Sequence, residues 1–177
     1  MADNVREETI KKRRNVLNMI LYVLAIIWAL LFGLMAAICL NALFSNDLSL
    51  ANIVLFVILA GSALLLWFGK DYLRVEYEYS FTNGVVDIAQ VINNRRRKEL
   101  ASFRTKDAEI VAPIDDPKLR GIESRPNLKK IKAVLNGDSA IYFACFRQNE
   151  RACLLFFEPS NEFLKLMRIY NDRNIIL

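Results

Sequence analysis

Two long segments without charged side chains restrict the fold of this chain more than any other feature of its sequence. Between Arg14 and Lys70 the only charged residue is Asp47. As helices, segments 16–40 and 48–69 would span about 37 Å and about 33 Å, against a hydrocarbon core of about 30 Å. A chain of 177 residues is too short to cover two helices that are apolar on every side. The sequence therefore predicts two transmembrane helices.

Basic residues flank the two predicted spans on one side only. Segment 1–15 is rich in Lys and Arg, and Lys70 and Arg74 follow the second span, whereas the connecting loop 41–47 contains no Lys or Arg. Positively charged flanks stay in the cytoplasm. We therefore expect the loop outside the cell, both termini inside, and a cytosolic domain over 70–177 at the inner (plasma) membrane.

The first span carries a stripe of small residues at intervals of four. These residues are Ala25, Ala29, Gly33 and Ala37. Small residues at this spacing let two helix backbones approach closely. Packing against the tethered second span is the favoured interpretation, and a homodimer seam is the alternative. Neither span contains a charged residue, which argues against a proton relay or an ion pathway.

The rest of the chain has the apolar–polar alternation of β-strands. Within 74–82, one face collects Val75, Tyr77, Tyr79 and Phe81, as in a half-buried strand. The turn signal Asn83-Gly84 follows, and Asn93-Asn94 ends a second strand. Further strands are predicted over 96–103, 107–112, 128–135, 140–146 and 153–157.

A helix and two irregular segments complete the predicted domain. After Pro159 the pattern becomes helical, with one apolar face formed by Phe163, Leu166, Met167 and Tyr170. Asn136-Gly137-Asp138 repeats the hairpin signal. Segment 113–127 is long for a loop, and the sequence leaves open whether it is functional or disordered. The prediction is an α+β domain, in which a seven-stranded antiparallel meander is closed by a C-terminal helix.

Segments 76–84, 92–98 and 156–159 resemble a family of small bacterial membrane proteins of unknown function. Members have two N-terminal transmembrane helices and a pleckstrin-homology-like (PH-like) cytosolic domain. The resemblance implies a bent sheet or partly open barrel closed by its last helix. It carries over no catalytic or ligand residue. Phosphoinositide binding is not implied either, because the first hairpin turn at 82–85 contains no Lys or Arg.

Catalytic chemistry has little support in this sequence. Histidine is absent, which removes the commonest general base and the commonest metal ligand. Cys145 and Cys153 lie in predicted apolar strands, where a thiol is usually an inert core residue. Asp115-Asp116 in a Pro-containing loop is typical of a turn. We expect no enzymatic activity, no cofactor and no metal site.

Three basic clusters are candidates for contact with lipid or with a partner. They are residues 11–14; Arg95, Arg96, Arg97 and Lys98; and Lys129, Lys130 and Lys132. A solvated surface is the plainer interpretation of any one cluster. However, the linker 70–73 reaches only about 14 Å, and a cation held near anionic lipid is worth about 1 kcal/mol.

These features predict a non-enzymatic, membrane-anchored interaction module that presents a PH-like domain to a protein partner. The sequence identifies no partner, small-molecule ligand or oligomeric state. A sensor of anionic lipid is the first alternative, and an accessory subunit of a transporter or membrane enzyme complex is the second. Nucleic acid is not expected as a partner, because the chain lacks a recognition helix and an aromatic-plus-basic motif.

Overall fold

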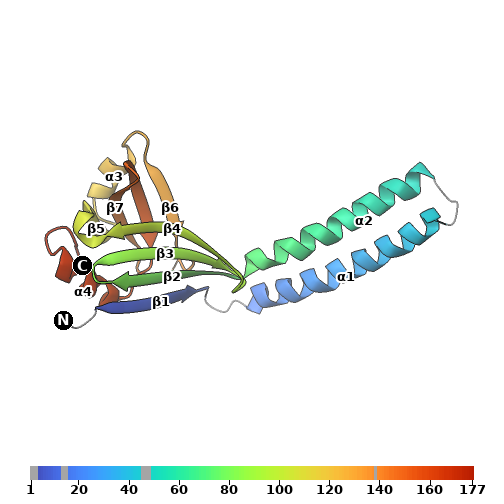
Figure 1. The fold of residues 1–177 in the computed structure, drawn as a ribbon, viewed down its shortest axis with the longest axis horizontal. Coiled ribbons are helices and arrows are strands. Elements are labelled where there is room, and N and C mark those ends of the chain that lie inside the picture. The colour runs from blue at the N-terminus through green and yellow to red at the C-terminus, as the bar shows by residue number, and fades with distance from the viewer. Residues whose placement is uncertain (1–3, 13–15, 45–48, 138) are drawn as a thin grey trace. The chain divides into compact units, whose positions relative to one another are not determined.

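The computed structural model describes residues 4–12, 16–44, 49–137 and 139–177. The chain divides into two compact units, a helical pair within 13–75 and a β domain (Figure 1). The β domain combines residues 76–177 with the N-terminal residues up to Lys12. The two units are described separately below.

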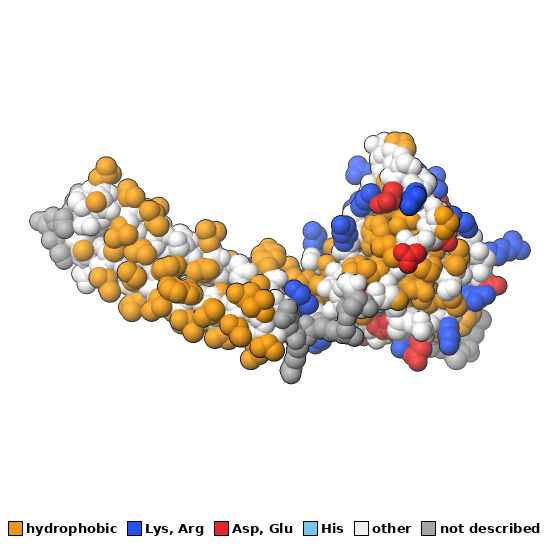
Figure 2. All heavy atoms as spheres, turned by 180° about the vertical axis from the view of Figure 1, so that it is seen from behind, with side chains coloured by type: hydrophobic (Ala, Val, Ile, Leu, Met, Phe, Trp, Pro, Cys, Tyr) orange, Lys and Arg blue, Asp and Glu red, His pale blue; other side chains and the backbone are white. Residues whose placement is uncertain are grey.

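The helical unit is a hairpin of two apolar helices. Its elements are α1 (Val16–Phe44), α2 (Leu50–Gly69) and the short 3-10 helix η1 (Lys70–Leu73). Both long helices are apolar and long enough to cross a membrane. Among their described side chains only Ala29, Ala36 and Leu59 are buried, and hydrophobic side chains cover the visible surface of the pair (Figure 2). Their apolar surface is therefore left uncovered by protein, unlike that of a soluble core helix.

The small-residue stripe of α1 faces α2 over only part of its length. Ala25 is half-buried and Ala29 is buried, whereas Gly33 and Ala37 are exposed. Residues four apart drift by about 40° around a helix, and residues seven apart by only about 20°. The buried positions Ala29 and Ala36 follow the seven-residue spacing, so the stripe turns away from the partner helix.

The first sheet of the β domain has four strands in the order β1-β2-β3-β4. They are β1 (Val5–Lys11), β2 (Val75–Thr82), β3 (Val85–Ile92) and β4 (Arg96–Arg104). The predicted alternation in β2 is confirmed, because Tyr77, Tyr79 and Phe81 are buried. β1 was not predicted. It pairs antiparallel with β2, with Lys11 opposite Glu76.

Asn residues form the tight turns of this sheet, as predicted. Asn83 and Gly84 have φ of 48° and 89°, and Asn93 and Asn94 have φ of 49° and 52°. Two consecutive residues with positive φ are what a type I′ hairpin turn requires, and Asn and Gly tolerate this conformation best.

The second sheet corrects the prediction of a single seven-stranded antiparallel meander. Its strands are β5 (Ile110–Pro113), β6 (Lys129–Ala133), β7 (Tyr142–Gln148) and β8 (Arg151–Phe157). Their order is β5-β7-β8-β6, and β6 runs parallel to β8. Among its described residues the domain therefore has two sheets of four strands each.

The predicted hairpin at Asn136-Gly137-Asp138 is also wrong, because β6 neighbours β8 rather than β7. Asp138 lies outside the described residues. Instead, the Glu158 carboxylate accepts the backbone N–H groups of Leu135 and Asn136, each at 2.7 Å. These bonds fix the segment after β6 at the end of β8. The hairpin of this sheet joins β7 to β8 through Asn149 and Glu150, which have φ of 51° and 62°.

Segment 113–127 contains an ordered short helix, α3 (Lys118–Glu123). Ile122 of α3 is buried in a cluster with Phe143 and Leu154 of the second sheet. The predicted strand over 107–112 begins later, at Ile110, because the 3-10 helix η2 (Thr105–Asp107) precedes it.

The closing helix α4 (Asn161–Tyr170) is confirmed. Its N-cap, Ser160, accepts a hydrogen bond from the Phe163 N–H at 3.1 Å. The fully buried face consists of Phe163, Leu164 and Met167, rather than the predicted set with Leu166 and Tyr170. Phe163 packs edge-on against Tyr79 and Phe81 of β2.

Candidate functional site

The first sheet has one end, called here the helix-side end, at which the chain leaves for α1 and arrives from α2. Lys11, the last residue of β1, lies opposite Glu76 near the start of β2. Because β2 and β3 are joined by a two-residue turn at the far end, β3 ends and β4 begins at this same end (Figure 1). Chain connectivity thus places the Asn93-Asn94 turn and the basic run after it at the helix-side end.

The four cations of the basic run are all exposed. Arg96 lies opposite Ile92, Arg97 opposite Val91, and Lys98 opposite Gln90. Paired residues share a face of a sheet and successive residues alternate, so Arg96 and Lys98 lie on one face and Arg97 on the other.

Carboxylates at this end neutralise only some of the cations. Glu78 pairs with Arg97 at 3.2 Å, and Glu76 pairs with Lys11 at 3.4 Å. Among the described residues, no carboxylate forms an ion pair with Arg95, Arg96 or Lys98. The helix-side end is therefore positive. Arg13 and Arg14 of the first basic cluster lie outside the described residues.

The lysine cluster lies on a different sheet, along its edge strand β6. Lys129, Lys130 and Lys132 are exposed, while Ile131 and Ala133 between and after them are buried. Lys130 and Lys132 share one face of the strand, and Lys130 pairs with Glu123 of α3 at 2.8 Å. Lys129 faces the other way and lines a cleft together with Arg147 and Arg151. Sequence reasoning did not group these two arginines with Lys129.

An apolar groove lies between α3 and the β6 edge of the second sheet. Its lining is Ile114, Leu119, Val134, Ile141 and Phe156, with Glu123, Lys130 and Lys132 as its charged members. On the face that Figure 2 shows, hydrophobic side chains of the β domain gather between charged ones.

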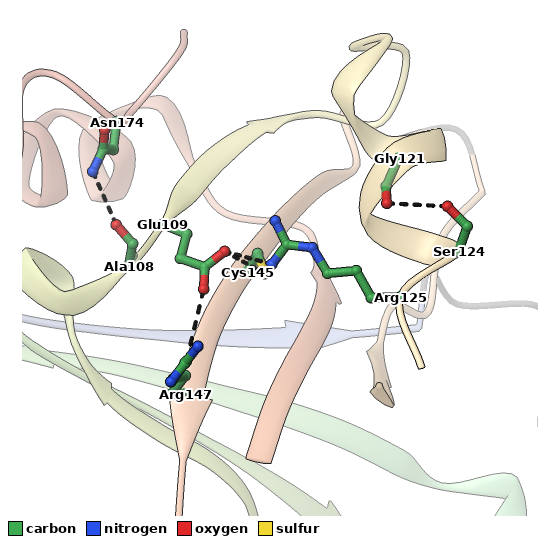
Figure 3. Close-up of polar contacts among 8 residues, drawn as sticks. All are labelled: Ala108, Glu109, Gly121, Ser124, Arg125, Cys145, Arg147 and Asn174. Atoms are coloured by element: carbon green, nitrogen blue, oxygen red, sulfur yellow. Dashed lines mark hydrogen bonds and ion pairs between the residues drawn. The ribbon is translucent and has the colours of Figure 1, made fainter. Parts of the chain in front are cut away.

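A polar cluster surrounds the buried thiol of Cys145 (Figure 3). Arg125 pairs with Glu109 at 2.6 Å, and its guanidinium lowers the pKa of this carboxyl. Arg147 approaches the other oxygen of Glu109 at 4.0 Å. Burial raises the pKa of Cys145 to about 11, so the thiol is protonated at neutral pH. A protonated thiol is a poor nucleophile.

The remaining candidates for chemistry have structural roles. Asp116 accepts the N–H of Lys118 at 2.8 Å, which is a turn contact at the start of α3. Cys153 is buried in β8. Within the part of the chain that the structure describes, no three Cys, Asp or Glu side chains come together as metal ligands would.

A comparison with known protein families gives one match. Residues 2–177 match the model of a family described as bacterial PH-like domain (DUF6106). No curated protein and no solved structure matches the chain. The resemblance to a PH-like family is thereby confirmed, over almost the whole chain.

Proposed function

The chain belongs to the bacterial PH-like domain family, and we propose that it is a membrane-anchored interaction module rather than an enzyme. In this proposal α1 and α2 span the inner membrane and hold the β domain at its cytoplasmic face. The uncovered apolar side chains of both helices support the anchor, because a bilayer would cover them. The absence of Lys and Arg from 41–47 supports the orientation.

The observation that carries the proposal is the position of the basic run. Residues 12–15 join β1 to α1 and residues 70–74 join α2 to β2, and five residues reach at most about 18 Å. The helix-side end must then lie close to the anionic inner leaflet. Arg95, Arg96 and Lys98 would contribute about 1 kcal/mol each there. We expect these cations to hold the domain against acidic lipid.

The test uses the full-length protein in nanodiscs, with Asn94→Cys carrying a fluorophore and Cys39→Ala removing the half-buried thiol. A quencher on the lipid headgroups reports how close the β3–β4 turn lies to the bilayer. Quenching should be stronger in discs with phosphatidylglycerol than in discs of phosphatidylcholine alone. The difference should vanish in about 1 M salt, where the Debye length is about 3 Å.

A charge-matched pair of variants makes this test specific. Changing Arg95, Arg96, Arg97 and Lys98 to Gln should abolish the dependence on lipid charge. The control variant loses four exposed cations elsewhere, namely Lys106, Lys118, Arg120 and Lys165, and should behave as the wild type. If quenching in the wild type does not depend on lipid charge, or if both variants lose this dependence equally, the basic run does not hold the domain against acidic lipid.

The apolar groove beside α3 favours a protein partner as the second role of the module. Among the described residues Lys132 has no ion pair, so a partner with apolar side chains flanked by acidic ones would complement this surface. Ile114 is 38% exposed, and Ile114→Asp should remove a co-purifying partner without unfolding the domain. The four-Gln variant should retain the same partner. If Ile114→Asp leaves every co-purifying protein in place, the groove is not the docking surface.

A further inference from the structure

A basic cleft lies where the β7–β8 turn meets the start of β6. Two adjoining hollows share Lys129 and Arg151 as lining residues. The larger hollow has a volume of about 820 Å³ and is also lined by Arg147 and Glu150. The smaller hollow adds the amide side chains of Gln148 and Asn149.

Strand pairing, rather than a flexible loop, brings these residues together. β6 runs parallel to β8 with Lys129 opposite Cys153, two residues beyond Arg151. Across the hairpin, Gln148 pairs with Arg151. Asn127, also in the lining, has φ of 60° just before β6. Strand pairing therefore places Lys129, Arg151 and Gln148 on one face of the sheet. Arg147, opposite Ala152, lies on the other face and lines only the larger hollow.

Two of the three cations of the cleft have no carboxylate partner among the described residues. Among the described residues Lys129 and Arg151 form no ion pair, and Arg147 reaches only Glu109, at 4.0 Å. Glu109 is already bound by Arg125 at 2.6 Å. Three cations thus line the cleft with a single acid, Glu150. A hollow lined by one sign of charge concentrates ions of the opposite sign.

The donor types suit an oxyanion with several oxygens. Guanidinium groups bind phosphate oxygens through paired N–H donors, and a Lys ammonium adds a compact charge. Asn and Gln amides can donate to the remaining oxygens. The side-chain oxygen of Gln148 is buried without a hydrogen-bond partner among the described residues, so no hydrogen bond to this oxygen fixes the orientation of the amide.

We propose that Lys129, Arg147 and Arg151 form a binding site for a phosphate-bearing anion, supplied by a lipid headgroup or by a soluble phosphorylated molecule. This site goes beyond the proposed function, because it lies on the second sheet and uses none of the residues 95–98.

The experiment uses the full-length protein in maltoside micelles, which contain no phosphate. Inorganic phosphate is titrated against chloride at equal ionic strength, and hydrogen exchange is followed over residues 147–153. Phosphate should slow exchange there in a saturable way. The double variant Lys129→Gln, Arg151→Gln should weaken the apparent affinity by about tenfold or more, since a charge-assisted hydrogen bond contributes at least this factor. The charge-matched control Lys106→Gln, Arg120→Gln should bind as the wild type does.

A second arm in phosphatidylglycerol nanodiscs distinguishes the two sources of phosphate. If the lipid headgroup is the ligand, the segment is protected before phosphate is added, and phosphate changes nothing further. If the ligand is soluble, the response to phosphate matches that in micelles. The four-Gln variant of residues 95–98 should respond normally, so failure of the proposed function leaves this result unaffected. Absence of protection in both arms, or equal responses of the double variant and its control, would overturn the site.

Discussion

At the scale of single residues, Tyr79 and Glu158 link separate parts of the β domain through buried polar contacts. The Tyr79 hydroxyl accepts the N–H of Glu158 at 3.1 Å and donates to the carbonyl oxygen of Ala133. Burial raises the pKa of Tyr79, so it remains a donor at physiological pH. Together with the bonds from Glu158 to Leu135 and Asn136, these contacts fix β6 beside β8. A buried polar group that loses its partner costs about 1–3 kcal/mol.

Gly84 provides the first prediction, because two independent effects require glycine there. Its φ is 89°, and a Cβ at this position would lie 2.6 Å from the ring of Tyr170. The left-handed backbone alone costs alanine about 1–2 kcal/mol. Gly84→Ala should therefore lower the free energy of unfolding by more than this amount, measured by urea unfolding in micelles with near-ultraviolet circular dichroism.

The control for Gly84→Ala is the same change in a Tyr170→Ala background. Without the Tyr170 ring, only the cost of the left-handed backbone should remain. Gly84→Ala should therefore lower the free energy of unfolding less in the Tyr170→Ala background than in the wild type. An equal cost in both backgrounds would show that Tyr170 does not pack on this turn.

At the scale of secondary-structure elements, local patterns determine some parts of this fold and leave others open. The sequence could predict β2, its Asn83-Gly84 turn and α4. The spacing of apolar residues and the residue types of a turn depend only on residues that are neighbours in the chain. β1 could not, because it is rich in charged residues and its partner β2 lies about seventy residues later in the chain. Arg151 likewise meets Lys129 only through the pairing of β6 with β8.

The parallel placement of β6 was missed for a related reason. The sequence after it contains Asn136-Gly137, which favours a hairpin locally. The Glu158 carboxylate binds Leu135 and Asn136 from 23 and 22 residues away, and this contact has no local signature. The basic run 95–98, in contrast, is contiguous in sequence and could be identified directly, although its position at the helix-side end depends on the sheet.

The packing of α4 gives the second prediction. Phe163 is fully buried, with its ring centroid 6.2 Å from that of Tyr79 and 5.9 Å from that of Phe81. Phe163→Ala should lower the free energy of unfolding by about 3–5 kcal/mol through lost burial and a cavity. Lys165→Glu, on the exposed side of the helix, should cost far less. Equal tolerance of both substitutions in urea unfolding would mean that α4 does not pack as described.

β1 gives the third prediction, which concerns a truncated chain. A fragment over 72–177 lacks β1, leaving an edge of β2 unpaired, and also lacks Glu8. The Glu8 carboxylate accepts the N–H of Ser160 at 3.1 Å and the hydroxyl of the same residue, next to the start of α4. Backbone amides of β2 should therefore exchange faster in the fragment than in the full chain.

A synthetic peptide over residues 4–12 should restore protection when added to this fragment. The same peptide with Glu8→Lys should be weaker, because it cannot accept the Ser160 hydrogen bonds. If the fragment exchanges as slowly as the full chain without any peptide, β1 is dispensable for the first sheet.

At the scale of the whole molecule, the pairing of β1 with β2 bears on the topology. β1 precedes α1 and β2 follows α2, and the two strands form one ladder from Val5↔Thr82 to Lys11↔Glu76. If the helices span a membrane, this ladder can form only when both flanks lie on the same side. The argument is independent of the charge bias that indicates which side is cytoplasmic.

Cysteine labelling in intact cells tests the central claim, an anchored module with its β domain inside, most directly. In a Cys39→Ala background, Ser45→Cys lies in the predicted external loop, and Asp172→Cys lies at a side chain that is 74% exposed on the β domain. Cys145 and Cys153 are both buried and should not react. An impermeant maleimide should label Ser45→Cys in intact cells and Asp172→Cys only after permeabilisation. Labelling of Asp172→Cys in intact cells, with Ser45→Cys protected, would contradict the account.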